Sequence, residues 1–448
     1  MAHNCAISNY LKILKIQISK IMTFKFQLIA CFILMTLMSC DNKIAQQEDY
    51  IKYLSSNVDE QKNNLQTDIK FWSDKLNETP NQFPYYIKRG GVYSKLFTLT
   101  GDISMLKNAE SDFLKANEVT NYSNLSYLRA LSMNYISQHK FKEALNLLEK
   151  AEKIGDQLNG TQKMLFDVHL ELGDDFAAKH YLDKIKNKSD FDCFIRMAKF
   201  QDHNGDLDAA ITYMEKAKDV AESSNLKGIK KWAYTNLADF YGHDGRIEDS
   251  YQYFLKALEL DPNDAYAKKG IAWIAYANDN NPKEAIFILN KILDDHKSPD
   301  YYLLLSEIAQ YNENEKLANS ALKNYNQLLE NNMFGDMYNT YNILYYAEQP
   351  GIKSKALELA KIEVENRPTT ASYALLAWSY FKNGEIEKAK NIALTEVDGK
   401  TSEPEALYHL AEIYKASGNQ DRVKPLKQEL KGSIFELGPQ MGLKINQL

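Results

Sequence analysis

The stretch from Lys231 to Asn263, KWAYTNLADFYGHDGRIEDSYQYFLKALELDPN, contains two patterns of helical spacing on either side of a glycine. The first pattern consists of Tyr234, Leu237, Ala238 and Tyr241, and the second consists of Ser250, Phe254 and Ala257. Gly245 lies where helices commonly end in a left-handed residue, and Pro262 cannot continue the second helix. The stretch therefore predicts two antiparallel helices. Ala238 and Ser250 are expected to face each other at the crossing, where a larger side chain would cost about 1–3 kcal/mol.

Small residues recur along the chain at the position that Ser250 occupies in this hairpin. The series is Ala109, Ala144, Ala178, Ala210, Ser250, Ala285, Ala318, Ala356, Ala389 and Val423. Its members are separated by nearly equal intervals, of which the longest lies between Ala210 and Ser250. A regular interval of this size is typical of stacked helical hairpins, each of which buries its apolar face on its neighbours. The sequence thus predicts an all-α solenoid of about ten hairpins.

The order of large, leucine, small and tyrosine positions in the first helix, followed by a small and an aromatic position in the second, resembles the tetratricopeptide repeat. The agreement is clearest at Tyr373, Leu376, Ala377, Tyr380, Gly384 and Ala389. The resemblance covers about residues 83–430. It implies a right-handed superhelical α-solenoid, in which the first helix of each pair lines a concave surface that binds a protein or peptide partner.

Composition and charge limit the possible ligands. The chain has 448 residues, of which 44% are hydrophobic, and a formal net charge of −6. The segment Met1–Cys40 holds four lysines and no acid, so the remainder carries 50 basic against 60 acidic side chains, or −10. This balance argues against nucleic acid as the main ligand and against attraction to anionic lipid.

The N-terminus carries an apolar run, Phe26–Met38, directly after Lys25. The run is too short to span a membrane as a mature helix and has the length of a signal-peptide core. It leads into Leu37-Met38-Ser39-Cys40, which resembles a bacterial lipoprotein box. The resemblance implies removal of residues 1–39 and a lipid anchor on Cys40. A plain signal peptide or an uncleaved anchor remains the alternative, and Met22 is a second possible start.

These features predict the order of segments and the location of the protein. A lipidated tether over 40–48 is followed by an N-terminal capping helix over 49–80, the repeat array over 83–430 and a C-terminal tail or cap over 431–448. The anchor implies the bacterial cell envelope, at the inner or the outer membrane. Cys193 is the other cysteine after the cleavage point and is expected to be a buried, apolar residue.

Motifs that carry chemistry are absent from the sequence. The eight histidines form no HExxH pattern and no pairing with cysteines at metal-ligand spacing. Gly399-Lys400-Thr401 lacks the upstream glycine of a phosphate loop, and Asp202–Asp208 is explained as a repeat turn followed by a helix cap. We therefore expect no catalytic residue, no cofactor and no metal site.

The groove-facing positions of the first helices divide the array into two halves. The earlier repeats present mainly charged residues, namely Arg129, Lys163, Asp167, Glu171, Asp192, Arg196, Lys199, Asp202 and Asp239. The later repeats present aromatic residues, and we predict a partner-binding groove formed by Tyr266, Trp273, Tyr276, Tyr338, Tyr341, Tyr345, Trp378 and Phe381. Exposed aromatic side chains are enriched at binding hot spots. A shift of one or two residues in register would instead place these rings in the core.

These features favour an envelope-anchored scaffold or adaptor that binds a protein or peptide in its groove. An alternative is capture of glycans or nutrients, because outer-membrane starch-utilisation lipoproteins carry similar repeats and aromatic rings stack on sugars. An enzyme is the third possibility, and it would need a site assembled between distant repeats.

Overall fold

Small residues bring the two helices of each hairpin together along the array. The computed structural model describes residues 43–448, apart from 186–189 and 332. All ten members of the predicted series are buried, with at most 2% of their surface exposed. The described residues form helices and no strand, and the helices pack pairwise as hairpins, which confirms the predicted all-α class. The predicted signal peptide and Cys40 lie outside the described residues.

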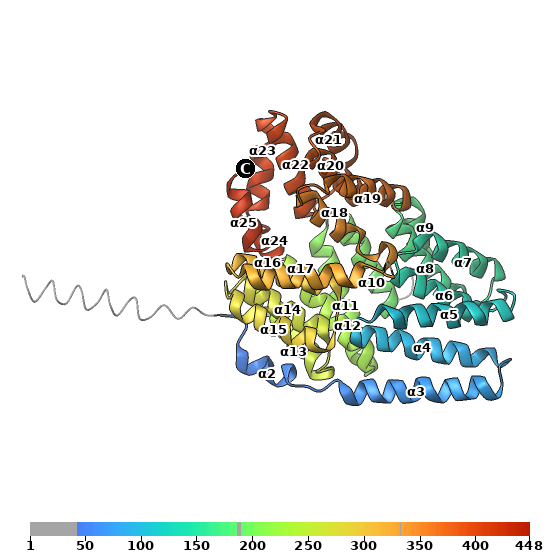
Figure 1. Ribbon diagram of the computed structural model, residues 1–448. Helices are drawn as coiled ribbons and strands as arrows, with labels where there is room; N and C mark the ends of the chain where they lie inside the picture. The colour runs from blue at the N-terminus through green and yellow to red at the C-terminus, as the bar shows by residue number, and fades with distance from the viewer. Residues whose placement is uncertain (1–42, 186–189, 332) are drawn as a thin grey trace, which may run out of the picture. The chain divides into compact units, whose positions relative to one another are not determined.

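Ten hairpins follow one another through the described part of the chain (Figure 1). They are α4 (Phe83–Thr100) with α5 (Ile103–Val119), α6 (Leu125–Ser137) with α7 (Phe141–Ile154), α8 (Leu158–Glu171) with α9 (Asp175–Ile185), α10 (Phe191–His203) with α11 (Leu207–Ser224), α12 (Lys227–His243) with α13 (Ile247–Leu260), α14 (Ala265–Ala277) with α15 (Pro282–Asp295), α16 (Pro299–Tyr311) with α17 (Glu315–Leu329), α18 (Asn339–Glu348) with α19 (Lys353–Asn366), α20 (Thr370–Lys382) with α21 (Ile386–Ile392), and α22 (Pro404–Ala416) with α23 (Gln420–Leu430). A 3-10 turn, η1 (Gly335–Tyr338), precedes α18, and a π-helical turn, η2 (Ala393–Val397), continues α21.

Local chemistry sets the turn inside each hairpin, as the turn between α10 and α11 shows. Gly205 has φ of +79°, a conformation that glycine adopts without steric cost. Its amide donates to the carbonyl of Asp202, and the amide of Asp206 donates to the carbonyl of Gln201. The carboxylate of Asp206 then accepts from the amide of Ala209 and caps α11. The predicted turn and cap in this stretch are therefore confirmed.

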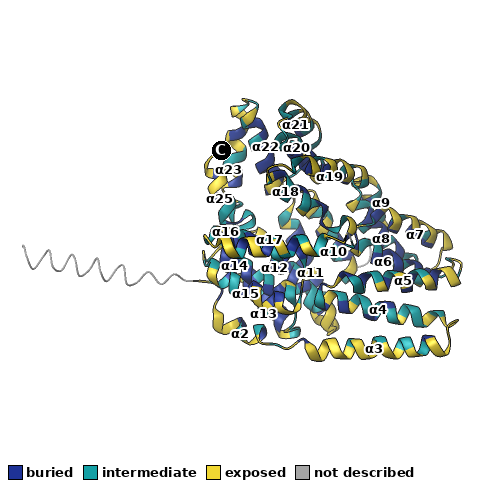
Figure 2. Cartoon of the chain, viewed as in Figure 1, coloured by how far each residue is buried: buried dark blue, intermediate teal, exposed yellow. Residues whose placement is uncertain are grey.

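The segment before the array forms two helices, α2 (Gln47–Leu54) and α3 (Asp59–Glu78), where the sequence suggested one capping helix over 49–80. In the break between them, the Ser56 hydroxyl lies within hydrogen-bond distance of two carbonyl oxygens, that of Tyr53 on α2 and that of Pro262. Only α3 packs on α4 of the first hairpin, and it exposes most of its surface to solvent (Figure 2). Instead, α2 packs on α13 and α15, far along the sequence.

The residues directly before α2 are held in place by the array. The amides of Ile44 and Ala45 donate to the carboxylate of Asp279 at 3.0 and 2.9 Å. The hydroxyl of Tyr50, which is 1% exposed, donates to Glu284 at 2.7 Å. Much of the expected tether over 40–48 is therefore a fixed strap, Ile44–Leu54, on the middle hairpins.

The array coils until hairpins that are distant in sequence touch each other. The amide of Lys297 donates to the carbonyl of Thr100 at 2.9 Å. Arg367 forms an ion pair with Glu171 at 2.9 Å, across a sequence separation of 196. A Cβ atom at Gly173 would lie 3.1 Å from the Pro368 carbonyl oxygen, so a side chain there would press on this contact. Successive turns of the superhelix therefore rest on each other through their loops.

The C-terminal tail returns to the middle of the array as α24 (Ile434–Leu437) and α25 (Pro439–Asn446). The short helix α24 contacts α12, α14 and α22, and α25 contacts α16 and α23. The indole Nε1 of Trp273 donates to the Phe435 carbonyl oxygen at 3.0 Å. A Cβ at Gly242 would lie 3.1 Å from the Phe435 ring. The tail thus joins the inner helices of hairpins that are distant in sequence.

Close helix approach at Gly270 gives a test of this packing. A Cβ at this position would lie 2.2 Å from the ring of Phe254, which is 3% exposed and enclosed by the core. We expect Gly270→Ala to lower the free energy of unfolding by about 1–3 kcal/mol. The matched change Gly91→Ala, where nothing lies within 4 Å of the added methyl, should raise it by about 0.5–1 kcal/mol because alanine favours helix. Urea unfolding followed by circular dichroism measures both, and equal effects would contradict the packing.

Candidate functional site

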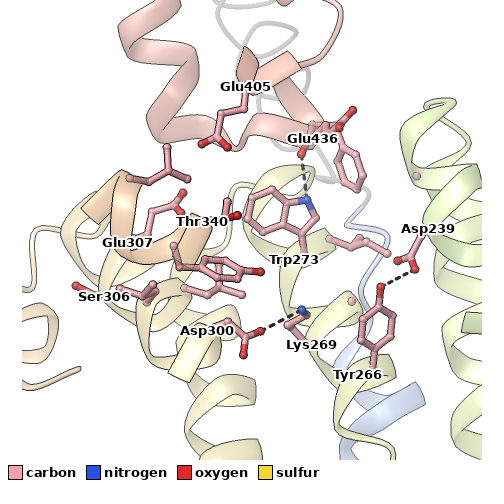
Figure 3. Close-up of a pocket in the computed structure, with 18 of the residues that line it drawn as sticks. Asp239, Tyr266, Lys269, Trp273, Asp300, Ser306, Glu307, Thr340, Glu405 and Glu436 are labelled. Atoms are coloured by element: carbon pink, nitrogen blue, oxygen red, sulfur yellow. Dashed lines mark hydrogen bonds and ion pairs between the residues drawn. The ribbon is translucent and has the colours of Figure 1, made fainter. Parts of the chain in front are cut away.

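The inner helices enclose a cavity of about 840 Å³ in the middle of the array (Figure 3). Most of its lining comes from α12, α14, α16 and α18, together with Glu405 of α22 and Phe435 and Glu436 of the tail. A second cavity of about 1040 Å³ extends along α8, α10, α20 and α22. Thr340 and Glu405 line both cavities, so the two spaces adjoin.

Four lining residues occupy equivalent positions in successive repeats. Asp239, Trp273, Glu307 and Tyr341 follow one another at equal intervals of one repeat. They lie on α12, α14, α16 and α18, and all four line the first cavity. Because the repeat places equivalent residues on the same face of each first helix, acidic and aromatic side chains alternate along the wall. We call these four residues the ladder.

Four of the eight predicted groove residues line this cavity. Tyr266 and Tyr341 keep 44% and 43% of their surface exposed, and Trp273 and Tyr345 are half-buried. The hydroxyl of Tyr266 donates to the Asp239 carboxylate at 2.7 Å, which holds the ring beside the ladder. Trp273 is fixed through its bond to the tail. The structure thus brings these four aromatic rings together in one concave space.

The other four predicted residues lie elsewhere. Tyr276, Tyr338 and Trp378 are buried, and Phe381 is half-buried away from the cavity. Trp378 stacks on the His409 ring at 4.1 Å, because α20 packs against α22. Tyr276 donates to Glu307 at 3.3 Å from behind the wall. These rings support the wall, and the part of all eight residues in partner binding stays a prediction.

The carboxylates opposite and within the aromatic wall include residues that the sequence reasoning missed. Asp239 was among the charged groove positions, whereas Asp300, Glu307, Glu405 and Glu436 were not. Glu307 could have been identified from its place one repeat interval after Trp273. Glu405 and Glu436 reach the cavity from the tenth hairpin and the tail, and no local pattern places them there.

Enclosure by the protein changes the acidity of these carboxylates. It raises the pKa of Asp239 to about 6, although the hydrogen bond from Tyr266 opposes the shift. It raises the pKa of Glu307 to about 7 against the hydrogen bond from Tyr276. The Glu405 carboxylate is open to water in the cavity but surrounded by protein, and this enclosure together with the charge of Glu403 raises its pKa to about 7. Burial likewise raises the pKa of Glu436.

Charged residues of the earlier repeats pair with each other between neighbouring hairpins. Lys163 contacts Asp192 at 2.8 Å, and Arg196 binds Asp167. These charged groups are therefore paired within the chain, and Lys163 and Arg196 are buried between the hairpins, with 7% and 8% of their surface exposed. The cavity of the later repeats differs because most of its carboxylates have no such cationic partner in the described structure.

Metal ligands, a cysteine thiol and membrane-spanning helices are the remaining features that could carry a function. No cluster of histidine, cysteine, aspartate and glutamate there could hold a metal ion. Cys193 is buried, with its sulfur 3.9 Å from the sulfur of Met197. None of the helices described combines the length and the apolar character that a bilayer span requires.

The fold and the cavity define a helical-repeat solenoid with a lined interior. Residues 191–224 and 233–264, the hairpins α10–α11 and α12–α13, match the tetratricopeptide repeat family. These two of the ten hairpins therefore carry tetratricopeptide repeats.

Known proteins with this repeat show partial similarity. Human tetratricopeptide repeat protein 6 is 26% identical over 208 residues, which cover 46% of this chain and only 37% of that protein. Among solved structures, YrrB, described as a TPR protein with an unusual peptide-binding site, is 20% identical with a TM-score of 0.27, over 44% of this chain and 95% of its own. The TPR domain of P58(IPK) is 13% identical with a TM-score of 0.28, over 86% of this chain and 94% of its own.

The raised pKa values predict a pH-dependent stability that two substitutions remove. Glu307 and Glu405 have an ordinary pKa of 4.5 when unfolded and about 7 in the native state. Between these pH values the native state holds protons that the unfolded chain has released, so stability from these groups is lost as the pH rises. We expect the double variant Glu307→Gln with Glu405→Gln to melt like the wild type near pH 4.5 and at a higher temperature near pH 8.

The comparison of the wild type with the double variant separates these carboxylates from two histidines whose pKa values are lowered. Burial lowers the pKa of His139 to about 4 and that of His409 to about 3, and these groups favour the folded state as the pH rises. Both histidines are present in both proteins, so their contribution cancels in the difference. A constant difference in melting temperature across the pH range would contradict the raised pKa values.

Proposed function

We propose that this chain is a non-catalytic scaffold that binds a protein or peptide partner on the inner wall of its repeats. The observation that carries the proposal is the pair Tyr266 and Tyr341, whose rings stay 44% and 43% exposed inside a cavity. Most large aromatic side chains of the array are buried or half-buried in hairpin packing. Concave surfaces with rigid, accessible aromatic rings supply the anchors that dominate binding energy.

A capture experiment tests the groove assignment. The chain from Asp41 is immobilised, and proteins retained from an envelope extract are identified and then measured individually. We expect Tyr266→Ala with Tyr341→Ala to weaken each specific partner by about tenfold or more, because both anchors are removed. The matched variant Phe71→Ala with Phe176→Ala removes rings that are 51% and 88% exposed outside the cavity, and should bind normally. Full retention of every partner by the tyrosine variant would contradict the groove assignment.

The same pair of proteins addresses the carbohydrate alternative. A glycan array probed with the wild-type chain and the tyrosine variant reports saccharide binding and its dependence on the two rings. If the wild-type chain binds a specific saccharide and the tyrosine variant does not, the ligand of this wall is a glycan and not a peptide.

We further propose that the protein is attached to the bacterial cell envelope through a lipid on Cys40. The support is the apolar run followed by Leu37-Met38-Ser39-Cys40. Ile44 is fixed to Asp279 only four residues after Cys40. Four residues reach at most about 14 Å, so a lipid at Cys40 would hold the turn between α14 and α15 close to the membrane surface.

Substitution of the cysteine tests the anchor. In a bacterial host grown with labelled palmitate, we expect the wild-type chain to carry label and to sediment with membranes. Cys40→Ser should lose both the label and the sedimentation, because the lipid attaches through the Cys40 sulfur. Cys31→Ser, which lies within the predicted leader, should retain both. Unlabelled wild-type protein, or equal labelling of Cys40→Ser, would refute the anchor.

A further inference from the structure

We propose that the first cavity binds a basic segment of the partner, with a lysine or arginine side chain inserted between the ladder and the carboxylates of Glu405 and Glu436. This assignment rests on the proposed function, since it names the chemistry of the segment that the inner wall would accept. It is carried by the alternation of rings and carboxylates, by the charge of the lining and by the continuity of the two cavities.

The ladder offers both interactions that an alkylammonium or guanidinium group favours. The rings of Trp273 and Tyr341 alternate with the carboxylates of Asp239 and Glu307 along the first helices of four successive hairpins. A cation over an aromatic face is attracted by the ring quadrupole, and more strongly when water is excluded. A carboxylate beside the ring supplies a charged hydrogen-bond acceptor for the same group. Figure 3 shows Trp273 in the centre of these carboxylates.

The lining contains more acidic than basic side chains, and ion pairs among the described residues involve only part of this excess. Its carboxylate, histidine and lysine side chains are Asp239, His243, Lys269, Asp300, Glu307, Glu348, Glu405 and Glu436. Lys269 pairs with Asp300 at 3.6 Å, and Glu348 pairs with Lys382 at 2.7 Å. Among the described residues, no ion pair is formed by the other four carboxylates.

Hydrogen bonds from tyrosines satisfy two of these four carboxylates only in part. Asp239 accepts from Tyr266 and Glu307 accepts from Tyr276. The charge of Lys444 on α25 lowers the pKa of both Glu307 and Glu405, although it forms no ion pair with them in the described structure. A positive charge nearby therefore favours the ionised form of these carboxylates. A cation bound inside the cavity would be attracted to them in the same way.

The shape of the interior favours a chain segment over a small free cation. The first cavity of about 840 Å³ adjoins the second of about 1040 Å³ at Thr340 and Glu405. Together they follow the inner wall from α8 to α24, so a segment held at the ladder can continue past Glu405. An acidic segment would instead meet uncompensated carboxylates in an enclosed space, which is strongly unfavourable.

Calorimetry with two matched peptides tests the assignment. The titrants are a nine-residue peptide of alternating glycine and lysine and the same peptide with glutamate in place of lysine. We expect the chain from Asp41 to bind the lysine peptide and not the glutamate peptide at pH 8, where the cavity carboxylates are ionised. Glu307→Gln with Glu405→Gln should weaken the lysine peptide by about tenfold or more, because two charged acceptors are lost.

The control variant separates the cavity from general attraction to an acidic protein. Glu149→Gln with Glu358→Gln makes the same change in net charge on exposed positions of α7 and α19, and should leave the affinity within about twofold because exposed charges are screened. Circular dichroism melting of each variant confirms folding. Asp239→Asn with Glu436→Gln provides a second pair within the cavity and should also weaken binding.

The possible outcomes distinguish this inference from the proposed function. Equal binding of the two peptides, or equal affinity in the cavity and control variants, would overturn the basic-segment assignment. Binding of spermidine without the lysine peptide would overturn it in favour of a small cation. Partner capture that depends on Tyr266 and Tyr341, without lysine-peptide binding, would overturn the charge assignment and leave the scaffold function standing.

Discussion

The structure depends on how closely two helices can approach where they cross. In nine of the ten hairpins, the residue buried at the helix crossing is alanine or serine. In the last hairpin this position is occupied by Val423. Close packing of this kind fixes the angle and spacing of every hairpin, since side-chain volume leaves little free space in a protein interior. Small rotations between hairpins then add up along the array, until distant loops meet at Glu171 and Arg367. The crossing residues thus determine both the local hairpin and the closure of the superhelix.

Closure of the superhelix creates the interior site. Equivalent positions on α12, α14, α16 and α18 face one space because the repeat interval is constant from Asp239 to Tyr341. Residues from the tenth hairpin and the tail complete the lining, and Trp273 is held there by its bond to Phe435. A feature that one hairpin could not form alone therefore arises from repetition together with contacts between distant segments.

The sequence predicts the hairpins well because their signals lie within one repeat interval. The small residues, the glycine turns and the helix-ending prolines each act on neighbours in the same hairpin or the next one. Contacts such as Ile44 with Asp279 depend on the accumulated coil of the array, which local patterns do not encode. Groove-facing residues are harder to predict from the sequence. An error of one residue in the assigned register changes the direction of a side chain by about 100° around the helix, which is enough to move a ring from the cavity wall to the core. Trp378 shows this difference, since it is 4% exposed, whereas Trp273 is half-buried and lines the cavity.

The carboxylates of the inner wall differ between the two halves of the array in whether they form ion pairs. In the earlier repeats, groove-facing carboxylates such as Asp167 and Asp192 have cations from neighbouring hairpins beside them. In the later repeats, Glu307 and Glu405 are enclosed without an ion pair in the described structure, and their pKa values rise to about 7. Ionisation of such enclosed carboxylates destabilises the folded state at neutral pH. Packing alone does not require a carboxylate at these positions, because the glutamine side chain has nearly the same size and shape. Proteins carry local costs of this kind mainly at sites that interact with something else. The carboxylates without an ion pair and the exposed rings occur in the same cavity, and this coincidence is the physical basis for proposing the later half of the inner wall as the partner-binding surface.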